Sequence, residues 1–174
     1  MNGTNWVLAL WISLFPVEET RLTECHKTCV ASPMGEQLVM HFEGYSPYPY
    51  KDAAGYPTIG YGHLITPTSR YSIPLLPDEA KKLLRSDLKK ASKGVNRQVN
   101  VPLAQHRADA VISFTFNLGE GALQKSTLRK RINANRHEDV PNELSKWVYA
   151  DGKKLTGLVR RRQAEAVLYM APQQ

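Results

Sequence analysis

The chain has 174 residues, enough for one domain or a small two-lobed one with a substantial core. It is 42% hydrophobic and 22% charged, which argues against a disordered chain and against a bundle of membrane helices. The net charge is +7, but residues 1–80 carry four basic and eight acidic side chains, whereas residues 81–174 carry nineteen and eight. A basic C-terminal part favours contact with a polyanion, such as nucleic acid or an anionic cell envelope. No zinc-finger, RNA-recognition or basic-zipper pattern accompanies the charge, so nucleic acid is not the expected partner.

The first thirty residues differ from the rest. Trp6–Val17 is an apolar run of twelve residues without a charge. It is shorter than the about 20 apolar residues of a spanning helix, and no Lys or Arg precedes it, as one would in an export signal. A poor export signal, a releasable membrane anchor and an extension without a folded role all stay open. We expect residues 1–31 to be an N-terminal extension and residues 32–174 to be the folded catalytic domain.

The folded part begins with a helix and a small sheet. Ser32 is a good helix N-cap and Pro33 suits the first helical position, so a short helix is predicted over Pro33–Phe42. Gly44 ends it, since glycine accepts the left-handed conformation at a helix C-terminus. From Tyr45 to Ile65 the chain is rich in aromatic residues, Gly and Pro, which predicts a small, irregular antiparallel sheet.

After Pro77 the hydrophobic pattern is helical to the end of the chain. One short sheet followed by many helices indicates an α+β fold. The expected helices are Asp78–Asn96, Ala104–Leu118, Thr127–Ala134, Pro141–Trp147 and Leu158–Met170.

Two carboxylates in the N-terminal part suggest a chemistry. Glu43 stands at the end of the first helix, and Asp52 stands nine residues later in the glycine-rich sheet. Cleavage of a glycosidic bond needs one acid to protonate the leaving oxygen and a second carboxylate to assist the nucleophile. A Glu and an Asp at this spacing are weak evidence by themselves, because most such pairs are surface charges.

The surrounding residues make the pattern specific. Glu43, eight residues, Asp52, five residues and Thr58 resemble the catalytic signature of the phage-type lysozymes or endolysins, glycoside hydrolase family 24. Three collinear segments between residues 32 and 171 resemble the same family: FEGYSPYPYKDAAGYPTIGYGHL, FTFNLGEGALQKSTLRKRIN and WVYADGKKLTGLVRRRQAEAVL. The resemblance implies a lysozyme-like fold, with a small N-terminal β-hairpin lobe joined by a long helix to a mainly helical C-terminal lobe.

The resemblance also implies roles for the signature residues. Glu43 matches the general acid, Asp52 the carboxylate that orients or deprotonates the attacking water, and Thr58 a hydroxyl that helps to hold that water. It implies inversion at the sugar, with the carboxyls about 6.5–9.5 Å apart so that water fits between them. His63 matches a structural histidine that pairs with the helix acid at Asp87.

Substrate contacts carry over at Leu64, Phe116, Asn117, Thr127 and Asn142, which match positions lining the sugar groove in relatives. A core role for Phe116 is equally compatible with its place on an amphipathic helix, and Trp147 is expected in the core. One arginine of Arg160, Arg161 and Arg162 is expected to approach Glu43, and the others are expected at the surface.

The implied activity is that of an N-acetylmuramidase, acting on bacterial peptidoglycan in the periplasm or cell wall. A lytic transglycosylase has no need of Asp52, and a peptidoglycan-binding relative without activity would not need the whole signature. No cofactor is expected, and no metal, since Cys25, His26 and Cys29 fall short of a four-ligand zinc site. The protein is expected to be a monomer that reaches the wall through its N-terminal segment or through membrane lesions made by a holin.

Overall fold

The computed structural model describes residues 24–25, 28–52 and 55–172. The apolar run Trp6–Val17 lies outside these residues, so the three interpretations of it stay predictions. No helix in the described ranges is both long enough and apolar enough to cross a membrane.

The N-terminal lobe consists of a helix end and a small sheet. Helix α2 (Pro33–Glu43) is capped by Ser32, whose side chain accepts hydrogen bonds from two backbone N–H groups of the first turn, and it ends at Gly44 with φ +68°. Strands β2 (Ser46–Lys51), β3 (Pro57–Gly60) and β4 (His63–Leu64) then form an antiparallel sheet in that order. The helix and sheet predicted for this part of the chain are therefore confirmed.

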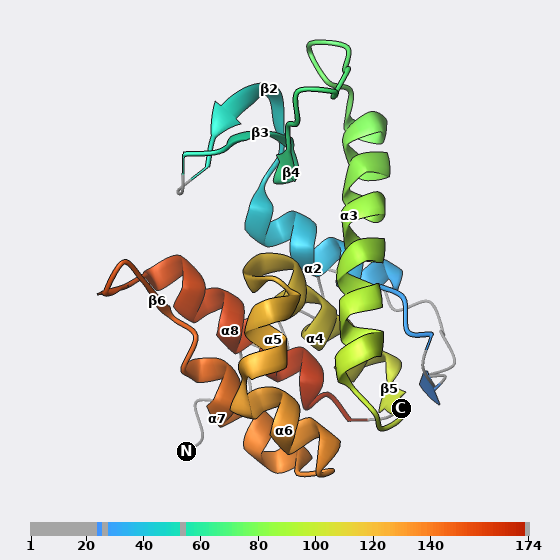
Figure 1. Cartoon of the computed structure of the whole chain (residues 1–174), viewed down its shortest axis with the longest axis vertical. Coiled ribbons are helices and arrows are strands. Elements are labelled where there is room, and N and C mark those ends of the chain that lie inside the picture. Colours follow the sequence, from blue (N-terminus) through green and yellow to red (C-terminus); the bar gives the residue numbers. More distant parts are fainter. Residues whose placement is uncertain (1–23, 26–27, 53–54, 173–174) are drawn as a thin grey trace.

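A long helix joins the two lobes. Helix α3 (Pro77–Gln98) has 22 residues, which at about 1.5 Å per residue makes it roughly 33 Å long. It runs beside the sheet at one end and beside the helical lobe at the other (Figure 1). Near the sheet it completes a small apolar cluster of Ile59, Leu75 and Ala80.

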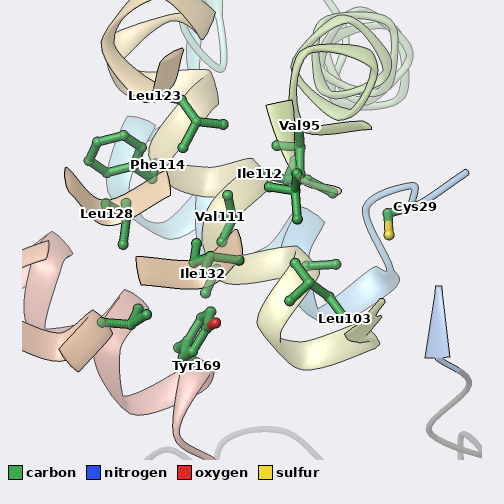
Figure 2. Close-up of a cluster of buried hydrophobic side chains, with 14 of the residues drawn as sticks. Cys29, Val95, Leu103, Val111, Ile112, Phe114, Leu123, Leu128, Ile132 and Tyr169 are labelled. Carbon is green, nitrogen blue, oxygen red and sulfur yellow. The ribbon is translucent and has the colours of Figure 1, made fainter. Parts of the chain in front are cut away.

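The C-terminal lobe is built around helix α4 (Gln105–Leu118), in which every residue from Ala108 to Thr115 is buried. Figure 2 shows its Val111, Ile112 and Phe114 among apolar side chains from the surrounding elements. This arrangement confirms the predicted α+β architecture, with a small sheet lobe and a mainly helical lobe joined by a long helix. The helices around α4 include α5 (Glu120–Lys125), α6 (Thr127–Asn133), α7 (Val140–Ser145) and α8 (Thr156–Tyr169), with a 3₁₀ turn at His137–Asp139.

Several short elements were not predicted. Helix α5 starts directly after Gly119, because this glycine, with φ +83°, ends one helix and begins the next instead of opening a loop. Strands β6 (Tyr149–Ala150) and β7 (Lys153–Lys154) form a two-residue hairpin that is too short to show a hydrophobic period.

The packed part of the chain also extends upstream of Ser32, where the sequence predicted the domain to begin. Strand β1 (Glu24–Cys25) pairs with β5 (Leu103–Ala104) in an antiparallel register. Cys29 is buried in the main core, and its backbone N–H and C=O both bind the Asn96 side chain of α3, at 3.0 and 2.9 Å. Residues 28–31 thus belong to the folded body.

Two histidines in the helical lobe should make the fold sensitive to mild acid. Burial and the neighbouring Arg107 cation lower the pKa of His106 and of His137 below the ordinary value of 6.5. The unfolded chain therefore takes up protons at a higher pH than the folded one, so the stabilising contribution is complete above pH 6.5 and is lost as the pH falls through the folded pKa. His106→Leu should flatten this decline, as measured by urea unfolding at about pH 7.5 and about pH 5.5. An unchanged difference between the two pH values would contradict the assignment.

Candidate active site

Glu43, the last residue of α2, is held by an arginine from the other end of the chain. Arg161 Nη1 on α8 donates a hydrogen bond to Glu43 Oε1 at 2.5 Å. The Arg161 side chain is only 4% exposed, whereas that of Glu43 is 20% exposed. The Arg161 guanidinium also lies 5.7 Å from the centre of the Phe42 ring. The carboxyl group is thus fixed in direction at a partly open surface, which suits a group that must transfer a proton to a substrate.

Gly62, in the turn between β3 and β4, packs directly against this carboxyl. Its φ is +77°, and a Cβ built there would lie 2.9 Å from Glu43 Oε2. A Cβ at this position would therefore make the Glu43 carboxyl shift, and the positive φ also favours glycine. Sequence reasoning did not single out Gly62, because a glycine in a glycine-rich turn does not reveal what it touches.

Asp52 follows β2 and anchors the turn to β3. Its Oδ1 accepts a hydrogen bond from Tyr56 N at 2.8 Å, and its own backbone N–H donates to Tyr56 O at 2.9 Å. Tyr50, the next-to-last residue of β2, lies within electrostatic range of both carboxylates. Partial burial, then Glu43, then Asp52 raise the pKa of its phenol above the ordinary value of 10.0. Glu43 and Asp52 thus stand before and after the same strand, β2.

Thr58 lies in the middle of the sheet, opposite Tyr50 on one side and Leu64 on the other. It is 3% exposed, and its hydroxyl donates a hydrogen bond to Tyr56 O at 3.0 Å. In this structure the hydroxyl therefore supports the same turn that holds Asp52.

A cavity of about 650 Å³ begins beside this site. Gly62, His63 and Leu64 form one wall, and residues of α3 and α4, Phe116 among them, form another. Glu43 adjoins the cavity through Gly62, whereas Asp52 does not line it. Leu64 is exposed at its edge, and Phe116 both lines it and packs against the core. The two interpretations of Phe116 are therefore compatible in one side chain.

The structure brings His63 and Asp87 together across the boundary between sheet and long helix. His63 Nδ1 lies 2.5 Å from Asp87 Oδ2, and His63 Nε2 lies 2.8 Å from the Tyr71 hydroxyl. Lys90 Nζ binds the other oxygen of Asp87 at 2.8 Å. With both ring nitrogens engaged, His63 has the environment of a structural residue that fixes β4 on α3.

The remaining predicted substrate residues lie on three different helices of the C-terminal lobe. Asn117, near the end of α4, accepts a hydrogen bond from Arg162 Nη2 at 3.1 Å. Thr127 is exposed at the start of α6 and donates to the Glu143 carboxylate, and Asn142 is exposed on α7. None of Asn117, Thr127 and Asn142 lines the cavity. Trp147 is partly buried, edge-on to the Phe114 ring at 5.4 Å.

The positions of the three consecutive arginines correct the expectation that two of them are surface charges. Arg161 is the one that reaches Glu43, and Arg160 is exposed, but Arg162 is only 1% exposed and is not a surface charge. Its Nη2 binds Glu165 Oε1 at 2.9 Å, and its guanidinium lies 5.1 Å from the Phe114 ring centre. Glu165 itself was missed, although its spacing of three residues from Arg162 on a helix was a usable signal.

The site thus has two carboxylates and a fixed guanidinium, and a cavity adjoins it. These are the groups that acid-assisted hydrolysis of a glycosidic bond requires. Among the described residues, no group of three His, Cys, Asp or Glu side chains has the arrangement to hold a metal ion.

Comparison with known proteins identifies relatives. A family model described as phage lysozyme matches residues 40–165, a span that includes Glu43, Asp52 and Glu165. The SAR-endolysin of Escherichia phage Mu is 36% identical over 138 residues, which are 78% of each chain. The endolysin of Bacillus phage B103 is 37% identical over 141 residues, which are 80% of this chain but 53% of that protein. The match thus spans about half of the B103 protein.

Solved structures that are similar to this chain in fold and sequence come from proteins of the same kind. The muramidase domain of SpmX from Asticcacaulis excentricus has a TM-score of 0.74 and 32% identity, over 82% of this chain and 98% of that one. An endolysin from the Escherichia coli phage FAHEc1 has the same TM-score and identity, over 85% and 96% of the two chains.

Proposed function

The chain belongs to the phage lysozyme family, and from that membership we propose that it hydrolyses the β-1,4 bond between N-acetylmuramic acid and N-acetylglucosamine. It is a glycoside hydrolase of the lysozyme type, and peptidoglycan is its substrate. The observation that carries the proposal is that Arg161 holds the Glu43 carboxyl against Gly62 at the edge of the cavity, while Asp52 anchors the turn after β2 in the same lobe. Glu43 adjoins the cavity through Gly62, and Asp52 is proposed to act from the neighbouring turn.

In the proposed mechanism Glu43 donates a proton to the glycosidic oxygen as the bond breaks. The contact with Arg161 and the packing against Gly62 support this role, because they limit the directions in which the carboxyl can point. A fixed acid loses less conformational freedom on reaching the transition state than a mobile one.

Asp52 serves as the base that orients and deprotonates the attacking water. This role is supported by the hydrogen bond from Tyr56 N, which fixes the Asp52 carboxylate at the start of the turn between β2 and β3. Thr58 contributes through the same turn, by its hydrogen bond to Tyr56 O, and is proposed to help hold the water. Attack from the face opposite the leaving oxygen inverts the configuration of the sugar.

Two other functions use similar parts. A lytic transglycosylase forms an anhydro ring within the muramic acid and needs no base to activate water. The presence of Asp52, held by its hydrogen bond from Tyr56 N, therefore disfavours this activity. A relative that binds peptidoglycan without cleaving it would not need an arginine fixed on Glu43.

Mass spectrometry of the fragments from purified peptidoglycan distinguishes these functions. Hydrolysis predicts muropeptides that end in a reducing N-acetylmuramic acid, heavier by one water than the anhydro form. Anhydro ends as the main product would identify a transglycosylase, and intact glycan strands would identify a binding protein.

We propose further that the protein acts in the periplasm or cell wall, as the SAR-endolysin names among its relatives suggest for them. A monomer suits a site that is composed of residues of one chain. Passage to the wall would use the N-terminal segment or membrane lesions made by a holin.

A further inference from the structure

A buried carboxylate lies behind the arginine that holds Glu43. Glu165 on α8 is 0% exposed, and its Oε1 accepts hydrogen bonds from Ser113 Oγ at 2.8 Å, Arg162 Nη2 at 2.9 Å and Arg161 Nε at 3.4 Å. One oxygen atom of Glu165 thus binds both guanidinium groups and a hydroxyl from α4.

The two arginines extend from Glu165 in different directions. Arg161 reaches Glu43 with Nη1, and Arg162 reaches the Asn117 side chain with Nη2. Asn117 is one of the residues expected to contact the sugar chain. A single buried anion therefore connects the candidate general acid with a candidate substrate contact.

The cluster of Glu165, Arg161 and Arg162 contributes poorly to the stability of the fold, because some of its buried polar atoms have no partner. Glu165 Oε2 and two nitrogens of Arg162, Nε and Nη1, are buried without a hydrogen-bond partner among the described residues. Buried charges with incomplete partners usually cost more stability than apolar side chains of the same size. The cost is understandable if the charges serve the reaction instead.

We propose that Glu165 is a positioning residue for catalysis, whose negative charge balances Arg161 and Arg162 and so sets the pH range over which Glu43 keeps its proton. This inference rests on the proposed function, in which Glu43 is the general acid. The charge of Glu165 offsets one of the two arginine cations that lie near Glu43. Without its charge, the two arginines would together favour the ionised form of Glu43.

The other groups in this region fit the proposal. Glu43 is bound by Arg161 from α8, and the charges of Glu43 and Asp52 both act on the Tyr50 phenol of β2. Burial raises the pKa of Glu165, and Arg162, Arg161 and Ser113 oppose that rise. Burial lowers the pKa of Arg162 to about 10, so it stays cationic through the neutral range.

Charged groups on the elements packed against α8 are engaged elsewhere. On α7, Glu143 binds Lys146 and Thr127. On α4, the Asp109 carboxylate binds Ser32, and Arg107 lies over the Tyr169 ring. Ser113 is the α4 side chain that meets Glu165, and it carries no charge.

The test is the pH dependence of the rate on purified peptidoglycan in three variants. The alkaline decline of such a profile reports loss of the proton from the general acid. Glu165→Gln keeps the size of the side chain and removes its charge, so the alkaline decline should move to lower pH. We expect a shift of roughly one pH unit, the size produced by a unit charge about 10 Å away at an effective dielectric constant of about 20.

Arg162→Gln removes a cation instead, so the decline should move to higher pH. The double variant Glu165→Gln/Arg162→Gln restores the balance, and its decline should return close to that of the unmodified protein. Opposite shifts that cancel in the double variant would not result from a general loss of packing. If Glu165→Gln does not fold, the other two variants still decide, because an unmoved decline in Arg162→Gln overturns the proposal.

Asp109→Asn is the matched control. Asp109 is also a buried acid, 1% exposed, but its partners are Ser32, the N-cap of α2, and Gln105, the first residue of α4. It should lower the unfolding temperature and leave the alkaline decline in place. If Glu165→Gln behaves in the same way, Glu165 is only structural. A failure of the proposed function is distinguishable, since Glu43→Gln would then retain activity.

Discussion

Glu43→Gln should reduce the rate of cell-wall degradation by about 10²–10⁴-fold, the range that a positioned general acid contributes. Glutamine keeps the length of the side chain and an oxygen that can accept the Arg161 hydrogen bond, but it has no proton to give to the leaving oxygen. Chloroform-treated Gram-negative cells provide the assay, because loss of turbidity follows hydrolysis of the exposed wall. The measurement compares the initial rates of the two proteins at equal concentration.

Glu36→Gln is the control for this variant. Glu36 is on the same helix and also binds an arginine, Arg85, with Nε 2.8 Å from Oε2, but that pair lies outside the site. The control should clear cells at nearly the unmodified rate. Equal rates for Glu43→Gln and the unmodified protein would remove Glu43 from the chemistry.

Gly62→Ala should have the second-largest effect, a loss of activity of up to about 100-fold, as expected when a reacting group is displaced by about 1 Å. The new methyl group would lie 2.9 Å from Glu43 Oε2, and Arg161 prevents the carboxyl from simply moving aside. The positive φ of +77° adds a stability cost, which is about 1–2 kcal/mol for a residue with a Cβ.

Gly152→Ala separates the two effects of that substitution. Gly152 also has a positive φ, +74°, but a Cβ there meets nothing within 4 Å. Both variants should lose similar stability in thermal unfolding, and only Gly62→Ala should lose activity. Similar activities in the two variants would show that the carboxyl tolerates the displacement.

Much of the fold was predictable because its signals are local. Ser32-Pro33 and Gly44 mark the ends of α2 by their capping chemistry, and the structure begins and ends that helix within one residue of the prediction. The apolar period of residues 104–118 predicted α4 equally well, because almost all of one helix surface had to be buried. The roles of Glu43, Asp52 and Thr58 came from the resemblance of their spacing to a family signature, and they stay predictions.

The rest depends on contacts between residues far apart in the chain. Arg161 meets Glu43 across 118 positions, and no local pattern says which of three consecutive arginines turns inward. Arg162 looked like a surface charge because the sequence does not show that its side of α8 is buried, although the spacing of Glu165 pointed to an ion pair. Gly62 is similar, because its role is defined by the carboxyl that it touches and not by its neighbours in sequence.

The central claim is that Glu43 and Asp52 act from opposite faces of one glycosidic bond. Proton NMR of the first product released from a soluble glycan fragment tests it most directly, since it records the configuration at the new reducing end before mutarotation. The mechanism predicts that the α anomer appears first, because a single attack by water on a β-linked sugar inverts its configuration. A β anomer as the first product would mean retention, and Asp52 could not then be a base that directs water.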